Sequence, residues 1–228
     1  MKRLLPLAVL AFLSSLAWLP MGSASTTNLS PMLQDELLGK ATLVFQRTVD
    51  SPSAAIPAAI MHAARAVAVV PAARRDGERH YGMGIVSARG ADPQDWTPPA
   101  VVAFQGTIPV NLEVDAVDFV LLALTPRGLD HLSQAQPRVA PGSIFPGPIG
   151  QNTRVEIDVD LLAYMQFGDY LAGLPIEEWS IVGMKSANAL LYGRPYSTKE
   201  ILSGTRLRVP RTAQAWRNAL VAYFREMS

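Results

Sequence analysis

Glycine pairs and serines are the first residues of this 228-residue chain to test for chemistry. Gly82-Met83-Gly84 lacks the third glycine and the following helix that a nucleotide-binding loop requires, so a phosphate-cradling loop is excluded. Gly142-Ser143 lies in a proline-rich stretch and not at a strand–helix turn, which argues against a nucleophilic serine. The sequence therefore predicts no catalytic residue.

Three acidic residues, Glu156, Asp158 and Asp160, alternate with apolar residues along the predicted strand Arg154–Leu161. Carboxylates two residues apart on a strand are spaced by about 6.6 Å and could surround a hard cation. However, the segment lacks the glycine and the terminal glutamate of a calcium loop, and no second ligand-bearing segment is evident. A solvated outer face is favoured, and no metal site is predicted.

Arginines form the two remaining chemical features of the sequence. One group surrounds a charged turn at Arg74–Gly77, and segment 205–228 carries five arginines against Glu226, a local charge of +4. Arginine favours phosphate groups, including those of lipid headgroups, although solvent-exposed turns and helix ends also use it. The candidate lipid-contacting residues are Arg65, Arg74, Arg75, Arg79, Arg206, Arg208 and Arg211.

The composition limits the class of protein. A hydrophobic share of 49% with 17% charged residues predicts a folded chain, and the net charge of +1 gives no field that favours nucleic acid as a partner. The absence of cysteine excludes disulfides, thiolate zinc sites, a cysteine nucleophile and a lipidated cysteine. The three histidines, at positions 62, 80 and 131, are scattered, so we expect no cofactor.

The first 24 residues have the pattern of a targeting segment and not of a part of the folded domain. Lys2 and Arg3 precede the apolar run Leu4–Leu19, and small residues follow at Gly22 and Ala24. This order predicts a secretory signal peptide over residues 1–24. An uncleaved membrane anchor is the weaker alternative, because the run of about 16 residues is shorter than the ~20 that span a bilayer.

Periodicity then predicts an amphipathic helix within 25–52, a second helix from Pro57 to Ala64, and a series of strands and short helices. The predicted strands are Val67–Val70, Tyr81–Ala88, Trp96–Gly106, Val110–Asp115, Val117–Leu124 and Arg154–Leu161, and the later helices are Pro126–Leu132, Met184–Leu191, Ser197–Leu202 and one starting at Pro210 or Thr212. We therefore expect an α+β fold, an antiparallel β-sheet or partial barrel with helices packed on it and flanked by N-terminal and C-terminal helices.

A set of short motifs occurs in a recognisable order along the chain: Ile56-Pro57, Val67 to Pro71, Gly82-x-Gly84, Trp96-x-x-Pro99, Asp118 to Leu122, Gly147-Pro148, Ala163-Tyr164, Tyr170-Leu171-Ala172-Gly173, Tyr192-Gly193 and Ile201-Leu202-x-Gly204. In order and spacing these motifs resemble the SYLF domain, the lipid-binding and actin-patch-associated domain. The resemblance covers residues 53–204 and leaves 205–228 as a C-terminal basic helix.

The resemblance implies a non-enzymatic module that binds anionic phospholipid or a membrane surface. Together with the signal peptide it points to the bacterial branch, whose members are exported and are periplasmic or peripherally associated with an envelope membrane. Arg65-Ala66, Pro109 and Glu113 depart from the usual family residues, and the anchoring cysteine of many bacterial relatives is absent. An envelope protein–protein interaction through the sheet face or through loop 136–150 is the alternative, and a hydrolase built on the carboxylates of 156–160 is the third hypothesis.

Overall fold

A computed structural model of the chain describes residues 31–50, 56–92, 95–109, 114–134, 144–150, 159–204 and 207–226. The helices are α1 (Pro31–Val49), α2 (Ala58–Ala63), α3 (Pro126–Leu132), α4 (Lys185–Tyr192), α5 (Thr198–Leu202), η1 (Arg211–Ala213) and α6 (Gln214–Glu226). The strands are β1 (Ala66–Asp76), β2 (Arg79–Ala88), β3 (Ala100–Thr107), β4 (Ala116–Ala123), β5 (Phe145–Pro146), β6 (Leu161–Phe167), β7 (Tyr170–Gly173) and β8 (Glu177–Gly183).

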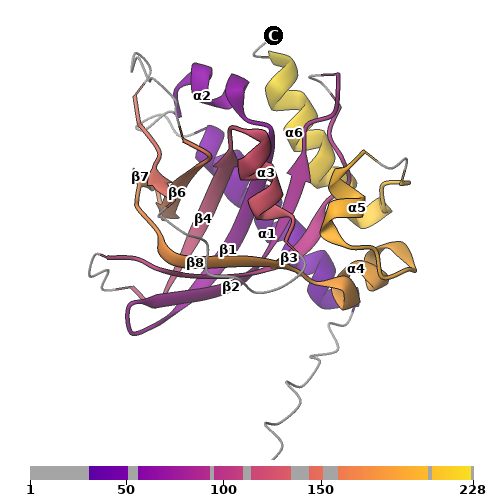
Figure 1. Ribbon diagram of the computed structural model, residues 1–228, viewed down its shortest axis with the longest axis horizontal. Coiled ribbons are helices and arrows are strands. Elements are labelled where there is room, and N and C mark those ends of the chain that lie inside the picture. Colours follow the sequence, from indigo (N-terminus) through magenta and orange to yellow (C-terminus); the bar gives the residue numbers. More distant parts are fainter. Residues whose placement is uncertain are drawn as a thin grey trace, which may run out of the picture.

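The strands form one curled sheet, a half-barrel with helices packed against it (Figure 1). Its order is β5-β6-β4-β1-β2-β3-β8, with β7 paired to β6. The strand pairs are antiparallel except β5 with β6, which is parallel. This architecture confirms the expected α+β fold with a partial barrel and helices at both ends of the described chain.

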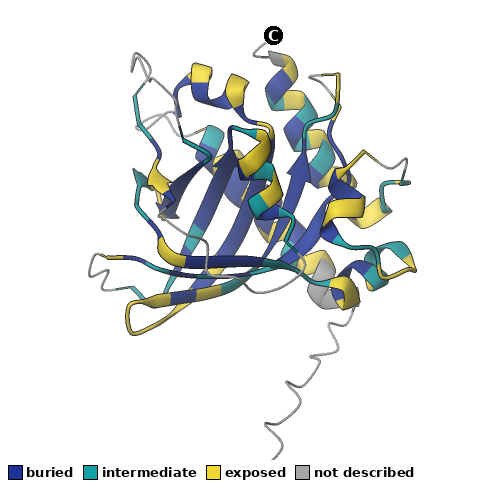
Figure 2. Cartoon of the chain, viewed as in Figure 1, coloured by how far each residue is buried: buried dark blue, intermediate teal, exposed yellow. Residues whose placement is uncertain are grey.

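Two hydrophobic cores lie on opposite faces of this sheet. On the outer face, α1 and α6 pack against the sheet, and Phe45 and Trp216 are fully buried between them. Inside the curl, Leu132 of α3 and Ile201 of α5 cover a second core that includes Phe119 of β4. Figure 2 shows the middle of the sheet buried and the β1–β2 hairpin exposed towards its tip.

The β1–β2 hairpin is longer than the sequence predicted. We expected Val67–Val70 to end at Pro71 and Arg74–Gly77 to be a turn, but β1 continues to Asp76, so that prediction was wrong. The reason is a bulge after Val70, where proline is tolerated, with Ala72 at a φ of 49° and its backbone N–H donating to Asp118 Oδ1 at 2.8 Å. The turn itself is reduced to Gly77 and Glu78.

Glycine is required where β1 and β2 approach each other at this bulge. A Cβ added at Gly84 would lie 2.5 Å from the Val69 carbonyl oxygen, and one at Gly82 would lie 2.6 Å from Val70 Cγ1. Both distances are shorter than a carbon atom allows, so the Gly82-x-Gly84 motif serves strand packing.

Parts of several predictions lie outside the described residues. These include the signal peptide 1–24, residues 136–143 of the loop 136–150, most of the acidic strand Arg154–Leu161, and Val110 to Glu113 of the strand predicted over Val110–Asp115. Val114 and Asp115 are described and are not part of a strand. In the described part of the chain, no helix combines the length and apolar character needed to cross a membrane.

His80 is a buried titratable group in the β1–β2 hairpin. Its side chain is almost wholly buried, with its ring centre 5.9 Å from that of Phe119. Burial lowers the pKa of His80 below its usual value of 6.5; a hydrogen bond with the Glu78 backbone opposes this effect, and the charge of Arg75 adds to it.

Because the unfolded chain then binds this proton more readily than the folded one, we expect the free energy of unfolding to fall as the pH drops below 6.5 towards the lowered pKa. Urea denaturation at a series of pH values measures this. In the variant His80→Phe this part of the pH dependence should disappear. Equal pH profiles for the two proteins would contradict the assignment.

Candidate functional site

The arginines that the sequence nominated for lipid contact do not come together in one place. Arg65 directly precedes β1, whereas Arg74 and Arg75 lie near the other end of that strand, roughly 30 Å away at ~3.3 Å per residue. Arg208 and Arg211 lie beyond α5, and Arg206 is outside the described residues. The structure therefore offers separate candidate surfaces.

The hairpin surface carries little net charge. Its three arginines, Arg74, Arg75 and Arg79, are exposed, but Asp76 and Glu78 lie in the same hairpin and reduce its charge to +1. In addition, an Arg79 guanidinium nitrogen lies 3.2 Å from Glu178 Oε2 on β8. This surface is a weak attractor for an anionic membrane.

A stronger positive surface is formed by α4, α5 and the segment that leads to η1; α4 and α5 lie at the right of the view in Figure 1. We call it the basic corner, and its exposed basic residues are Lys185, Arg194, Lys199, Arg208 and Arg211. Among the described residues from 185 to 211, Glu200 is the only acidic one, so five bases against one acid give a charge of +4. The corner thus concentrates positive charge on a chain that is nearly neutral overall.

Two of these arginines stand at the edge of a pocket of about 560 Å³. Arg208 and Arg211 line it together with apolar side chains of α4 and of the segment before η1. Tyr192 and Tyr196 are also in its wall, with ring centres 6.1 Å apart. Arg194 extends over the Tyr196 ring, with Cζ 5.6 Å from the ring centre. The pocket therefore combines guanidinium groups with tyrosine side chains, which suits an anion carried on an organic group.

Local sequence signals build this corner. Gly193 ends α4 with a φ of 71°, and the buried Asn188 side chain accepts a hydrogen bond from the Val101 N–H and donates one to the Tyr196 carbonyl oxygen. These two bonds, of 2.8 and 3.0 Å, connect strand β3 to the segment that carries Arg194 and Tyr196. The position of the pocket wall is thus set by a polar side chain inside the fold.

Two ionisable groups of the corner, Glu200 and Tyr192, have shifted pKa values. Hydrogen bonds from the Ser197 hydroxyl and N–H, which complete a capping box at α5, lower the pKa of Glu200. Burial raises the pKa of Tyr192, so its hydroxyl stays protonated and donates to the Pro99 carbonyl oxygen. Neither group is prepared for proton transfer at neutral pH.

Of the three acidic residues considered for a metal site, the structure describes Asp160, and both of its carboxylate oxygens have protein partners. Asp160 Oδ2 lies 2.8 Å from Arg127 Nε, and its other oxygen accepts a hydrogen bond from the Thr125 hydroxyl at the start of α3. The remaining acids of that ladder, Glu156 and Asp158, lie outside the described residues.

Sequence reasoning missed Lys185, Arg194, Lys199 and both tyrosines of the corner. The basic residues could have been found from the sequence, because the segment 185–211 contains six bases and one acid. The charge was summed only from residue 205 onwards, which left the first three of these bases out. The role of the tyrosines could not be found in this way, since it depends on how α4 packs against the chain before η1.

Comparison with known proteins identifies the family. The family model described as "Ysc84: Las17-binding protein actin regulator" matches residues 106–223, more than half of the chain. The chain belongs to the Ysc84 family. This confirms the resemblance to the SYLF domain, and the match includes the whole basic corner. The domain bounds 53–204 remain a prediction.

The yeast relatives that match this chain are distant in sequence. The chain is 27% identical over 138 residues to LAS seventeen-binding protein 3 of Saccharomyces cerevisiae (strain ATCC 204508 / S288c), which is 57% of this chain and 30% of the relative. It is 27% identical over 141 residues to Protein YSC84 of the same strain, covering 58% of this chain. The chain thus spans under a third of the length of these relatives. No solved structure matches it.

Proposed function

We propose that this member of the Ysc84 family is a non-enzymatic module that binds the surface of anionic membranes through its basic corner. The observation that carries the proposal is the charge of +4 on the basic corner, where Arg208 and Arg211 line a pocket. Each Lys or Arg near an anionic bilayer contributes about 1 kcal/mol of attraction, so five such residues are sufficient for peripheral binding.

The proposed module acts outside the cytoplasm. The support is the order of basic, apolar and small residues over positions 1–24, which is typical of a signal peptide. Its place is then an envelope membrane surface facing the periplasm. Protein recovered from the envelope fraction should begin at Ser25, and a chain that retains Met1 in that fraction would contradict export by cleavage.

Vesicle flotation tests the membrane proposal. Arg208→Glu with Arg211→Glu should weaken binding to anionic vesicles by at least about 30-fold, because two attractions of ~1 kcal/mol are lost and two repulsions are added. Binding of the unaltered protein should also decline as added salt screens the charges.

The matched control makes the same change in net charge elsewhere. Arg127 of α3 and Arg225, about 18 Å along the α6 axis from η1, are both exposed, and Arg127→Glu with Arg225→Glu should change binding far less. Equal losses in the two double variants would remove the basic corner from consideration. Failure of the unaltered protein to float with any anionic vesicle would overturn membrane binding itself.

Protein binding is the second candidate function, favoured by the relatives. One yeast relative is named for binding Las17, and the family description names the same partner and an actin regulator. For this chain the equivalent would be a protein partner at an envelope membrane. A complex of defined stoichiometry that forms without lipid and survives Arg208→Glu with Arg211→Glu would favour this function over the first.

A further inference from the structure

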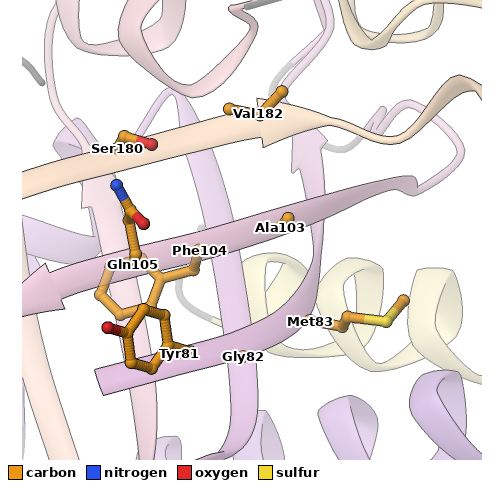
Figure 3. Close-up of a pocket in the computed structure, with 8 residues that line it drawn as sticks. All are labelled: Tyr81, Gly82, Met83, Ala103, Phe104, Gln105, Ser180 and Val182. Atoms are coloured by element: carbon orange, nitrogen blue, oxygen red, sulfur yellow. The ribbon is translucent and has the colours of Figure 1, made fainter. Parts of the chain in front are cut away.

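A groove of about 550 Å³ crosses the outer face of β2, β3 and β8, and it shares no lining residue with the pocket of the basic corner (Figure 3). The strand register arranges its lining in two rows. Tyr81, Gln105 and Ser180 are directly opposite one another on the three strands and form a polar row. Met83, Ala103 and Val182 form a second, apolar row two residues further along. Figure 3 shows both rows side by side.

The surface changes from charged to apolar along these strands. Beyond the polar row, the Arg79–Glu178 ion pair joins β2 to β8 at 3.2 Å. Beyond the apolar row, Ile85 and Val101 are paired and belong to the buried core beneath the outer helices. The groove therefore lies where the surface changes from water-facing charge to hydrocarbon. Successive rows are two residues apart along the strands, a separation of about 7 Å.

The polar row extends to a cation on the neighbouring strand. Arg74 of β1 is directly opposite Tyr81, and opposite residues of an antiparallel pair project from the same face. The row thus contains an exposed guanidinium, a phenol hydroxyl, an amide and the largely buried hydroxyl of Ser180 in succession. All four can donate hydrogen bonds to the oxygens of an anion.

The apolar row is hollow because its central residue is small. Ala103 offers only a methyl group between the longer side chains of Met83 and Val182. Gly82 also lines the groove with its backbone, because its Cβ position points to Val70 on the inner face. Methionine is well suited to irregular hydrocarbon surfaces, since its side chain is flexible and polarizable.

We propose that this groove holds one molecule of an anionic phospholipid, with its headgroup along the row from Arg74 to Ser180 and part of one acyl chain along Met83, Ala103 and Val182. The choice of lipid as ligand class rests on the proposed membrane function, but the contacts are separate from those of the basic corner. The graded chemistry selects a molecule with an anionic end and an apolar end. The corner would attract the bilayer, and the groove would bind a single lipid.

Titration with a single-chain lipid in monomeric form tests the proposal. The full chain is titrated with lysophosphatidylglycerol below the concentration at which it forms micelles, by isothermal calorimetry or native mass spectrometry. Ala103→Trp, which fills the apolar row, should weaken binding at least tenfold. Phe145→Trp adds the same indole to an exposed position of β5, at the other edge of the sheet, and should leave binding unchanged.

A second variant and a second lipid test the polar row. Arg74→Glu replaces an exposed side chain, which keeps the fold intact, and should weaken lysophosphatidylglycerol binding about tenfold. Lysophosphatidylcholine, whose headgroup has no net charge, should bind more weakly than the anionic lipid to the unaltered protein. Equal binding of the two lipids would overturn the assigned headgroup contacts.

The outcomes separate this inference from the membrane proposal. Ala103→Trp should still float with anionic vesicles, and Arg208→Glu with Arg211→Glu should still bind the monomeric lipid. If the unaltered protein floats with vesicles but binds no monomeric lipid, the groove proposal fails alone. If Ala103→Trp binds the monomeric lipid as tightly as the unaltered chain, the groove is not the site, and a peptide segment becomes the occupant to test.

Discussion

Replacing Trp216 by alanine should lower the free energy of unfolding by about 4 kcal/mol, the cost typical of a buried tryptophan reduced to a methyl group. Its side chain is fully buried on α6, and its Nε1–H donates a 2.9 Å hydrogen bond to the Ser87 hydroxyl of β2. Its ring also meets the Phe45 ring of α1 edge-on, with centres 5.6 Å apart. One residue thus joins both outer helices to the sheet.

Denaturation in urea measures this loss of stability. The variant Trp216→Phe separates the contribution of the buried ring from that of the hydrogen bond to Ser87. Phenylalanine keeps most of the buried ring but leaves the Ser87 hydroxyl without its donor, so we expect a smaller loss of about 2 kcal/mol. Because domains are stable by only ~5–15 kcal/mol, the alanine variant should be visibly less stable at 25 °C. A loss for Trp216→Ala no larger than that for Trp216→Phe would show that α6 is not held by this side chain.

The helices were predictable because their signals are local. Ser30-Pro31 marks the start of α1, and Thr125 followed by Pro126 marks α3, where the Thr125 hydroxyl accepts a hydrogen bond from the Gly128 N–H. The stripe containing Trp216, Leu220 and Phe224 predicts the apolar face of α6, and all three are buried. Local patterning and tertiary packing agree at these positions.

Strand β8 was harder to predict from its residues. Its sequence, Glu177 to Gly183, begins with two carboxylates and contains both Trp179 and Ser180, which gives no clear alternation. Glu178 has a φ of 42°, which breaks the regular alternation at the start of the strand. Its place at the sheet edge depends on pairing with β3, whose residues lie about 75 positions earlier in the chain.

The basic corner and the groove also differ in how far each could be predicted from the sequence. The basic residues of the corner lie within one continuous segment, so summing the charge over residues 185–211 would have found it. The groove instead combines residues from four strands, and only the register places Arg74 opposite Tyr81 and Gln105 opposite Ser180. Since a shift of one residue would turn every side chain to the other face, sequence alone could not reveal these rows.

Replacing Asn188 by alanine should affect both stability and membrane binding, because this side chain connects the core to the basic corner. Asn188 is fully buried, and its loss would leave the Val101 N–H and the Tyr196 carbonyl oxygen without their partners. Unpaired buried backbone groups cost about 1–3 kcal/mol each, so we expect a loss of about 3 kcal/mol in the free energy of unfolding. The segment with Arg194 and Tyr196 should also be less well positioned, and anionic vesicle binding should weaken several-fold.

Asn218 provides the matched control. It is an exposed asparagine on α6 whose side chain accepts a hydrogen bond from Gln214, and Asn218→Ala should change the free energy of unfolding by less than about 0.5 kcal/mol. Denaturation and vesicle flotation on both variants separate two ways in which the corner could work. If Asn188→Ala is destabilised but still binds vesicles as the unaltered protein does, the corner acts as diffuse positive charge. If both quantities fall together while the variant remains folded, the shape of the pocket around Tyr196 contributes to binding, since the number of charges is the same in the two proteins.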